Sequence, residues 1–134
     1  RLRVRALRKE GIEVQPLVYL PGKTSAVVGD GAVAFAAVGK TIWKIQGGWA
    51  APWFIHDRED VRDLALTASG GLFYATDSAV GYIGKEKPFE FLAAARPRLR
   101  LRQTDLYVYL PGSRAVMRIM KPAEFERFKA PQAP

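Results

Sequence analysis

The sequence predicts an all-β protein made of about three four-stranded antiparallel sheets, preceded by a basic N-terminal segment. Short runs rich in Val, Ile, Phe and Tyr follow one another between turns that contain Gly and Asp. Twelve glycines and nine prolines interrupt almost every window in which a helix could form. The third observation is that one arrangement of strands and turns recurs three times along the chain.

The recurring stretches end in isoleucines that are spaced by 38 and 36 residues, namely Ile45, Ile83 and Ile119. The stretches themselves cover residues 25–45, 63–83 and 98–119. A further extended piece follows each of them, at residues 52–56, 88–93 and 124–128. Four strands in roughly 40 residues is the period of a β-propeller blade. The sequence therefore predicts three propeller-type blades, over about residues 25–56, 63–93 and 98–129.

Turn residues separate the expected strands in each blade. Residues with small or polar side chains lie between the first and second strands, at 29–31, 69–71 and 104–105. Equivalent residues lie between the second and third strands, at 38–40, 76–78 and 111–113. Helices are expected in two places only, at residues 5–10 and at 122–129, where Pro122 suits a first helical turn. The second helix competes with an outer strand at 124–128, and both interpretations stay open.

Residues 1–24 form a basic segment before the main region at 25–134. The runs at 2–5 and 17–23 resemble those at 99–102 and 107–113. This similarity favours either a degenerate extra blade or one strand that closes a neighbouring blade. The first residue is Arg rather than Met, which suggests a processed chain or a segment of a longer one.

The net charge of +8 is concentrated in two short segments. Residues 1–10 and residues 96–102 each carry a net +4, and the rest of the chain is neutral. Both segments contain an arginine strip, RLRVR at 1–5 and RLRLR at 98–102. Strict alternation places the arginines on one face of a strand, where they repel one another unless anions face them. The candidate partner-binding residues are Arg1, Arg3, Arg5, Arg96, Arg98, Arg100 and Arg102.

Several kinds of chemistry are disfavoured by residue type and spacing. The absence of Cys excludes disulfides, cysteine zinc sites and thiol catalysis. The run Gly29-x-Gly31-x-x-Ala34 resembles a dinucleotide fingerprint, but Gly39 interrupts the helix that this site would need. Gly-Lys-Thr at 22–24 and 39–41 lacks the earlier glycine of a phosphate-binding loop. No cofactor is expected, and no apolar run is long enough to cross a membrane as a helix.

His56 is the single histidine, and it is followed by a run of acids at Asp57, Glu59, Asp60 and Asp63. No nucleophile elbow accompanies the histidine, and one His cannot build a multi-histidine metal site. The acids lack the spacing of a calcium loop and alternate with arginines. We expect an internally paired loop without metal, or an acidic patch that meets an arginine strip of another blade or chain.

Three tryptophans fall within residues 43–53. Trp49 and Trp53 are flanked by turn residues and form a candidate aromatic anchor, since Trp is enriched at binding hot spots. The alternative is that these rings fill the core between blades.

The run DLALTASGGLFYATDSAVGYI at 63–83 resembles the blades of propeller repeat proteins of the NHL and two-component-regulator types. At the level of pattern the resemblance covers residues 25–129. It implies a binding scaffold, often extracytoplasmic in bacteria, and it transfers no catalytic residue to this chain.

These observations favour a non-catalytic protein-interaction or scaffold module. Three blades do not close a ring, so we expect the chain to work in a larger assembly or to be completed by oligomerisation. One alternative is a ligand-binding or enzymatic propeller fragment with a site on its loop face. A second is a binder of nucleic acid or another polyanion through the arginine strips, although neither strip has aromatic residues among its arginines.

Overall fold

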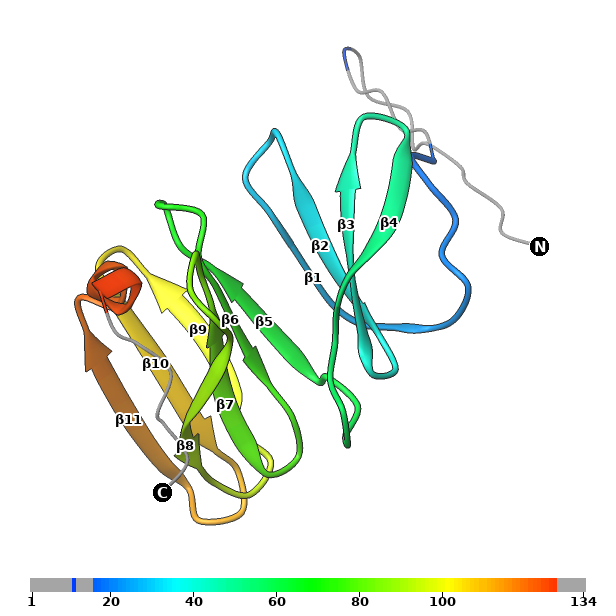
Figure 1. The fold of residues 1–134 in the computed structure, drawn as a ribbon. Helices are drawn as coiled ribbons and strands as arrows, with labels where there is room; N and C mark the ends of the chain where they lie inside the picture. Colours follow the sequence, from blue (N-terminus) through cyan, green and yellow to red (C-terminus); the bar gives the residue numbers. More distant parts are fainter. Residues whose placement is uncertain (1–10, 12–15, 128–134) are drawn as a thin grey trace.

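In the computed structural model, eleven strands form three antiparallel sheets, followed by one short helix (Figure 1). The structure describes Gly11 and residues 16–127. The prediction of an all-β protein is therefore confirmed, with two sheets of four strands and one of three. Among the described residues, no helix is long and apolar enough to cross a membrane. The first arginine strip and the helix expected at 5–10 lie outside the described residues.

Sheet 1 is a meander in which each strand pairs with the next. Its strands are β1 (Thr24–Gly29), β2 (Ala34–Val38), β3 (Thr41–Gln46) and β4 (Trp49–Ile55). The Asp30 carboxylate closes the first turn by accepting the backbone N–H groups of Ala32 and Val33, at 2.9 and 3.0 Å. Gly39 has a φ of 58°, the left-handed conformation that the tight β2–β3 turn requires.

Sheet 2 has the same order of strands and is the most buried part of the molecule. It contains β5 (Asp63–Leu66), β6 (Leu72–Ala75), β7 (Ala79–Ile83) and β8 (Phe89–Ala93). Gly81 on β7 lies directly under the ring of Tyr74, so that a Cβ at this position would collide with the ring. Both faces of this sheet are covered, which explains why its middle strands are nearly uniformly apolar.

Sheet 3 has only three strands, β9 (Arg98–Arg102), β10 (Asp105–Leu110) and β11 (Ala115–Met120). The prediction of an outer strand at 124–128 is wrong, because Pro122–Arg127 is a 3₁₀ helix. Of the two interpretations left open for this segment, the helical one is correct. The helix begins with Pro122 and buries Phe125 among aromatic rings, with Phe73 and Phe91 at centroid distances of 5.1 and 4.8 Å. Within six residues this 3₁₀ helix brings the Phe125 ring onto aromatic rings of sheet 2, whereas a strand beside β11 would continue the edge of sheet 3.

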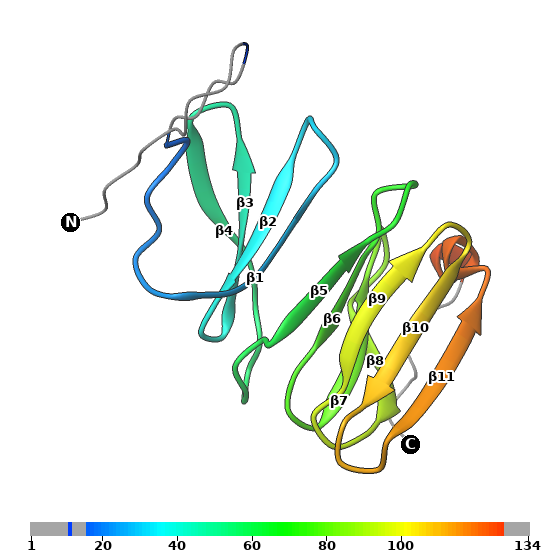
Figure 2. The ribbon, with the colours of Figure 1, turned by 180° about the vertical axis from the view of Figure 1, so that it is seen from behind.

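The three sheets are stacked, and their first strands lie side by side. β1 contacts β5, and β5 contacts β9 (Figures 1 and 2). One apolar layer lies between sheets 1 and 2 and includes Phe35, Ile42, Leu64 and Tyr74. A second lies between sheets 2 and 3 and includes Phe73, Tyr82, Leu99, Leu106, Val108 and Phe125. Sheet 2 therefore contributes to both cores, and sheets 1 and 3 each keep one face turned away from the stack.

Polar contacts tie neighbouring sheets together at the first strands. The Asp63 side chain on β5 accepts the backbone N–H of Leu99 on β9, at 2.7 Å. The Ser25 hydroxyl on β1 donates to the carbonyl of Val61, at 2.6 Å, just before β5. Because these bonds join different sheets at the same ends of their first strands, they fix the order in which the sheets are stacked.

Candidate functional site

The outward face of sheet 3 holds the second arginine strip. Leu99 and Leu101 point into the core between sheets 2 and 3, so the alternating arginines point away from it. Arg100 and Arg102 are exposed, and Arg98 is half-buried and donates a hydrogen bond to the carbonyl of Pro97 at 2.9 Å. The alternation in RLRLR thus predicts the orientation of these side chains correctly.

The neighbouring strands add two tyrosines and a fourth arginine to this face. Tyr107 on β10 lies opposite Arg100 on β9 and opposite Arg118 on β11. Tyr109 lies opposite Arg98 on one side and Val116 on the other. Leu106 and Val108 between them are buried, so both tyrosines share the outward face. We call this surface the arginine–tyrosine face; it comprises Arg98, Arg100, Arg102, Asp105, Tyr107, Tyr109, Val116, Arg118 and Met120.

The two tyrosines lie outside both arginine strips, so the residues within each strip did not predict them. They come instead from the next strand of the same hairpin, which the two-residue turn at 103–104 brings back against the strip. Pairing residues outward from that turn places Tyr107 beside Arg100. The alternation of Tyr107 and Tyr109 with buried neighbours was the signal that could have identified them.

The arginine–tyrosine face is strongly positive. It carries four arginines and one acid, Asp105, which gives a net charge of +3. Asp105 lies 3.9 Å from Arg118, a long contact between partly exposed groups. Within the described part of the chain, Arg100 and Arg102 have no carboxylate at ion-pair distance. These guanidinium groups are therefore available to an external anion.

The acidic run that follows His56 does not neutralise the arginine side chains of β9. Arg62 lies 3.9 Å from Asp60 and 3.4 Å from Asp77, and Arg58 lies 3.6 Å from Asp57. Asp63 does reach the second strip, but it binds a backbone N–H rather than a guanidinium group. The geometry thus matches the expectation of an internally paired loop. In the part of the chain that the structure covers, no group of three or more metal-binding side chains is assembled.

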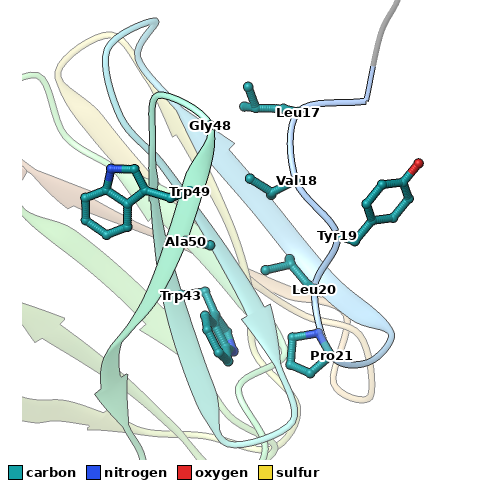
Figure 3. A pocket seen from close by; sticks show the side chains of 9 residues that line it. All are labelled: Leu17, Val18, Tyr19, Leu20, Pro21, Trp43, Gly48, Trp49 and Ala50. Atoms are coloured by element: carbon teal, nitrogen blue, oxygen red, sulfur yellow. The ribbon is translucent and has the colours of Figure 1, made fainter.

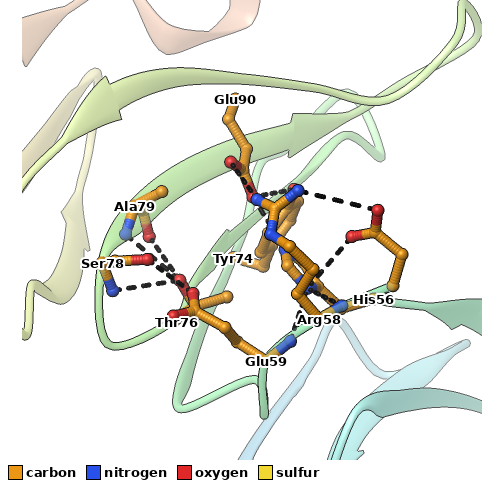
Figure 4. Close-up of polar contacts among 9 residues, drawn as sticks. His56, Arg58, Glu59, Tyr74, Thr76, Ser78, Ala79 and Glu90 are labelled. Atoms are coloured by element: carbon orange, nitrogen blue, oxygen red, sulfur yellow. Dashed lines mark hydrogen bonds and ion pairs between the residues drawn. The ribbon is translucent and has the colours of Figure 1, made fainter.

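His56 is buried and organises the connection between sheets 1 and 2 (Figure 4). Its Nδ1 accepts the backbone N–H groups of Arg58 and Glu59, at 3.1 and 3.0 Å. The proton of the neutral ring therefore lies on Nε2, which donates to Glu90 at 2.8 Å. Tyr74 donates to the same Glu90 oxygen at 3.2 Å. Both ring nitrogens are engaged in holding the loop, which argues against a role for His56 as a general base.

Other groups in this cluster are also held by structural contacts. The Ser78 hydroxyl donates to Glu59 at 2.6 Å, and this bond, with a contribution from Thr76, holds the pKa of the Glu59 carboxyl below its usual range. Burial, and then the nearby Glu90 carboxylate, raises the pKa of the Tyr74 hydroxyl. The adjoining cavity is small, about 240 Å³, which is below the usual size of a small-molecule site.

The tryptophans lie in different surroundings on sheet 1. Trp49 is 57% exposed and, with Trp43, lines an open groove of about 580 Å³ beside residues 17–21 (Figure 3). Trp53 is 37% exposed and packs against Phe35, at a centroid distance of 4.6 Å. The structure therefore places Trp49 on a surface groove, while Trp53 extends the packing at the edge of the core.

Arg96, a further predicted arginine, lies outside the arginine–tyrosine face. Arg96 is exposed in the connection between β8 and β9, where it has a left-handed φ of 49°. Its backbone N–H donates to the carbonyl of Asp77 at 2.8 Å. Arg1, Arg3 and Arg5 lie outside the described residues.

Comparison with known proteins finds no matching family model, no matching curated protein and no matching solved structure.

Proposed function

We propose that this chain is a non-catalytic interaction module that binds an anionic partner through the arginine–tyrosine face. The observation that carries the proposal is the density of positive charge on one exposed sheet face. Arg100, Arg102 and Arg118 stand on neighbouring strands with a single carboxylate, Asp105, among them. Like charges placed this closely destabilise a sheet unless a ligand compensates them, so retaining them favours a binding role over a purely structural one.

An enzymatic role has less support among the described residues. The one cluster of polar side chains with catalytic potential, around His56 and Glu90, uses its hydrogen bonds to hold the connection before β5. The adjoining cavity is small, and Tyr74, which borders it, is already bound to Glu90. A binding role needs neither a free base nor an enclosed pocket, and the arginine–tyrosine face meets its requirements.

We also infer that the three sheets are successive blades of a propeller-type stack. The side-by-side placement of β1, β5 and β9 supports this, since the first strands of blades surround a propeller axis. Sheets 1 and 2 share a bulge at the equivalent place in the fourth strand, where Trp53 and Phe91 are the extra residues opposite Ile42/Trp43 and Val80/Gly81. The resemblance of residues 63–83 to NHL-type blades agrees with both observations.

The two open ends of such a stack suit different neighbours. On the outward side of sheet 1, the apolar residues Val27, Ala36 and Trp43 pair across β1, β2 and β3. Val27 is 61% exposed and Trp43 is half-buried, whereas Ala36 is already buried. A further blade, from a longer protein or a second copy, would bury apolar side chains there. At the opposite end, covering by an apolar sheet would desolvate four arginines at a high energetic cost. We therefore assign assembly to the sheet 1 end and the anionic partner to the sheet 3 end.

The binding proposal is tested by titrating the protein with heparin and with polyglutamate at increasing salt. The variant Arg100→Ser/Arg102→Ser is compared with Lys85→Ser/Lys87→Ser, which removes the same charge from the exposed turn between β7 and β8. We expect the arginine variant to weaken binding and to reduce its salt dependence, while the lysine variant binds almost as the wild type does. Equal losses in the two variants would show that only net charge matters and would contradict a dedicated face.

A further inference from the structure

We propose that the anionic partner of the arginine–tyrosine face is a single-stranded nucleic acid. Bases would stack on the rings of Tyr107 and Tyr109, while the neighbouring arginines bind the phosphates. This inference rests on the proposed function and adds the chemical class of the ligand.

The order of side chains across the face suits a nucleic-acid ligand. Tyr107 has Arg100 on one side and Arg118 on the other, as its direct partners in the sheet. Directly paired side chains begin about 5 Å apart, so each guanidinium group can reach a phosphate attached to a base that covers the ring. Proteins that bind single strands combine the same two elements, an aromatic stacking platform and a positive groove.

The spacing of the two tyrosines along β10 suits stacked bases. Tyr107 and Tyr109 are two residues apart on one strand, which places their Cα atoms about 7 Å apart on the same face. Their separation lets each ring take its own base, so the face accommodates about two stacked bases. Val116 and Met120, both exposed on β11, extend the apolar surface on which the sugars and base edges could rest.

The shape of the surface favours a single strand over a duplex. The major groove admits a helix or a two-stranded ribbon. Here β9 is packed against β5, and the tyrosines lie on the middle strand of sheet 3. Unpaired bases can stack on rings at the centre of this sheet, whereas the bases of an undistorted duplex are already stacked on one another.

Two other anionic partners match the face less well. An acidic protein would pair with the arginines and leave the two tyrosine rings without a counterpart. A lipid bilayer would require the apolar side chains to insert together, yet Arg118 stands between Val116 and Met120 on the outward side of β11. Inserting the aliphatic residues would carry this arginine into the membrane interior, which is unfavourable.

The test measures the fluorescence anisotropy of a labelled single-stranded oligothymidine as the full chain is added at low salt. The variant Tyr107→Leu/Tyr109→Leu removes both rings, and Tyr107→Phe/Tyr109→Phe keeps them. Tyr19→Leu/Trp49→Leu is the matched control, since it removes two exposed aromatic rings at the other end of the stack. Circular dichroism establishes that each variant is folded.

If the inference is correct, the leucine variant binds the oligothymidine at least about tenfold more weakly, whereas the phenylalanine variant and the control retain affinity. Binding of the leucine variant to polyglutamate should be unchanged. A duplex of the same length should bind the wild type more weakly than the single strand.

Two results would overturn the inference and leave the proposed function standing. In one, oligothymidine, duplex and polyglutamate bind alike and the leucine variant binds as the wild type does. In the other, phosphatidylserine vesicles bind through the same arginines in preference to the oligothymidine. Failure of every polyanion to bind at low salt would overturn both proposals. Should the leucine variant fail to fold, loss of binding in the phenylalanine variant would still contradict stacking.

Discussion

The two ends of the stack are built from similar hairpins and present opposite chemistry. Across the middle of sheet 1, the outward row is Val27, Ala36 and Trp43, while across sheet 3 it is Arg100, Tyr107 and Arg118. The inward faces of both sheets are apolar and pack against sheet 2. The inward positions therefore determine how the sheets stack, while the outward positions are free to specify which partner each end contacts.

The largest expected effect on stability comes from removing the aromatic ring that packs the C-terminal helix against sheet 2. Phe125→Ala removes a buried ring that packs against Phe73, Phe89 and Phe91, and we expect it to lower the free energy of unfolding by about 3–5 kcal/mol. Hydrogen exchange should accelerate in β9–β11 more than in β1–β4. Glu124→Ala on the same helix is the control, with an expected change within about 0.5 kcal/mol. Equal acceleration in all three sheets would show that the stack unfolds as one unit.

Loss of the hydrogen bond that links β5 to β9 should have the next largest effect on stability. Asp63→Ala leaves the backbone N–H of Leu99 without its acceptor and also removes the bond to the N–H of Leu64. We expect a loss of about 1–3 kcal/mol in urea unfolding. Asp60→Ala, in the exposed pair with Arg62, should cost less than about 0.5 kcal/mol. Equal losses would mean that the contact between first strands contributes nothing particular to stacking.

Measuring self-association tests the role that we assign to the apolar face of sheet 1. Light scattering at rising concentration should give a mass above the 14.9 kDa of one chain. Val27→Asp, at a residue that is 61% exposed on β1, should weaken association about tenfold, because an apolar contact becomes a buried charge. Arg102→Asp at the opposite end should leave the mass unchanged. A wild-type chain that stays at 14.9 kDa under all conditions would contradict assembly through this end.

The smallest expected effect on stability comes from the tyrosine hydroxyl groups at the two interfaces between sheets. Burial, followed by a nearby carboxylate, raises the pKa of Tyr74 between sheets 1 and 2 and of Tyr82 between sheets 2 and 3. Their raised pKa values contribute stability below the ordinary value of about 10, and this contribution is lost as the pH rises above it.

We therefore expect the thermal midpoint of the wild type to fall above pH 10. Tyr74→Phe should be less stable than the wild type at neutral pH by about 1 kcal/mol, because the bond to Glu90 is lost. That difference should narrow in alkaline solution, where the wild type loses the stability of its neutral hydroxyl. The exposed Tyr19→Phe is the control, and a constant difference across pH would contradict the explanation.

The sequence predicts most of the strands because short-range patterns determine them. The glycines at 31, 39 and 70 adopt the positive φ that their turns need, and the outward direction of Arg98, Arg100 and Arg102 follows from alternation. The helix at Pro122–Arg127 depends on a tertiary contact, the burial of Phe125 between sheets. The alternating apolar and charged residues of this segment suit a strand equally well, so pattern alone could not choose between them.

The candidate site shows the same limit. Each arginine could be assigned to a face from its own strand, but its neighbours depend on the register of the hairpin. Tyr107 stands beside Arg100 only because the chain reverses at residues 103–104. The burial of His56 could not be predicted from the sequence either. It depends on a contact with Glu90, which lies on another sheet and 34 residues further along the chain.

The connections that follow sheets 1 and 2 are each hydrogen-bonded to the sheet that precedes them. In the connection after sheet 1, the backbone N–H groups of His56 and Val61 donate to the carbonyls of Lys40 and Gly39, respectively. In the connection after sheet 2, the N–H groups of Ala94 and Arg96 donate in the same way to the carbonyls of Ser78 and Asp77. A gene duplication that copies one sheet with the connection after it would thus yield a unit whose closing bonds are already internal.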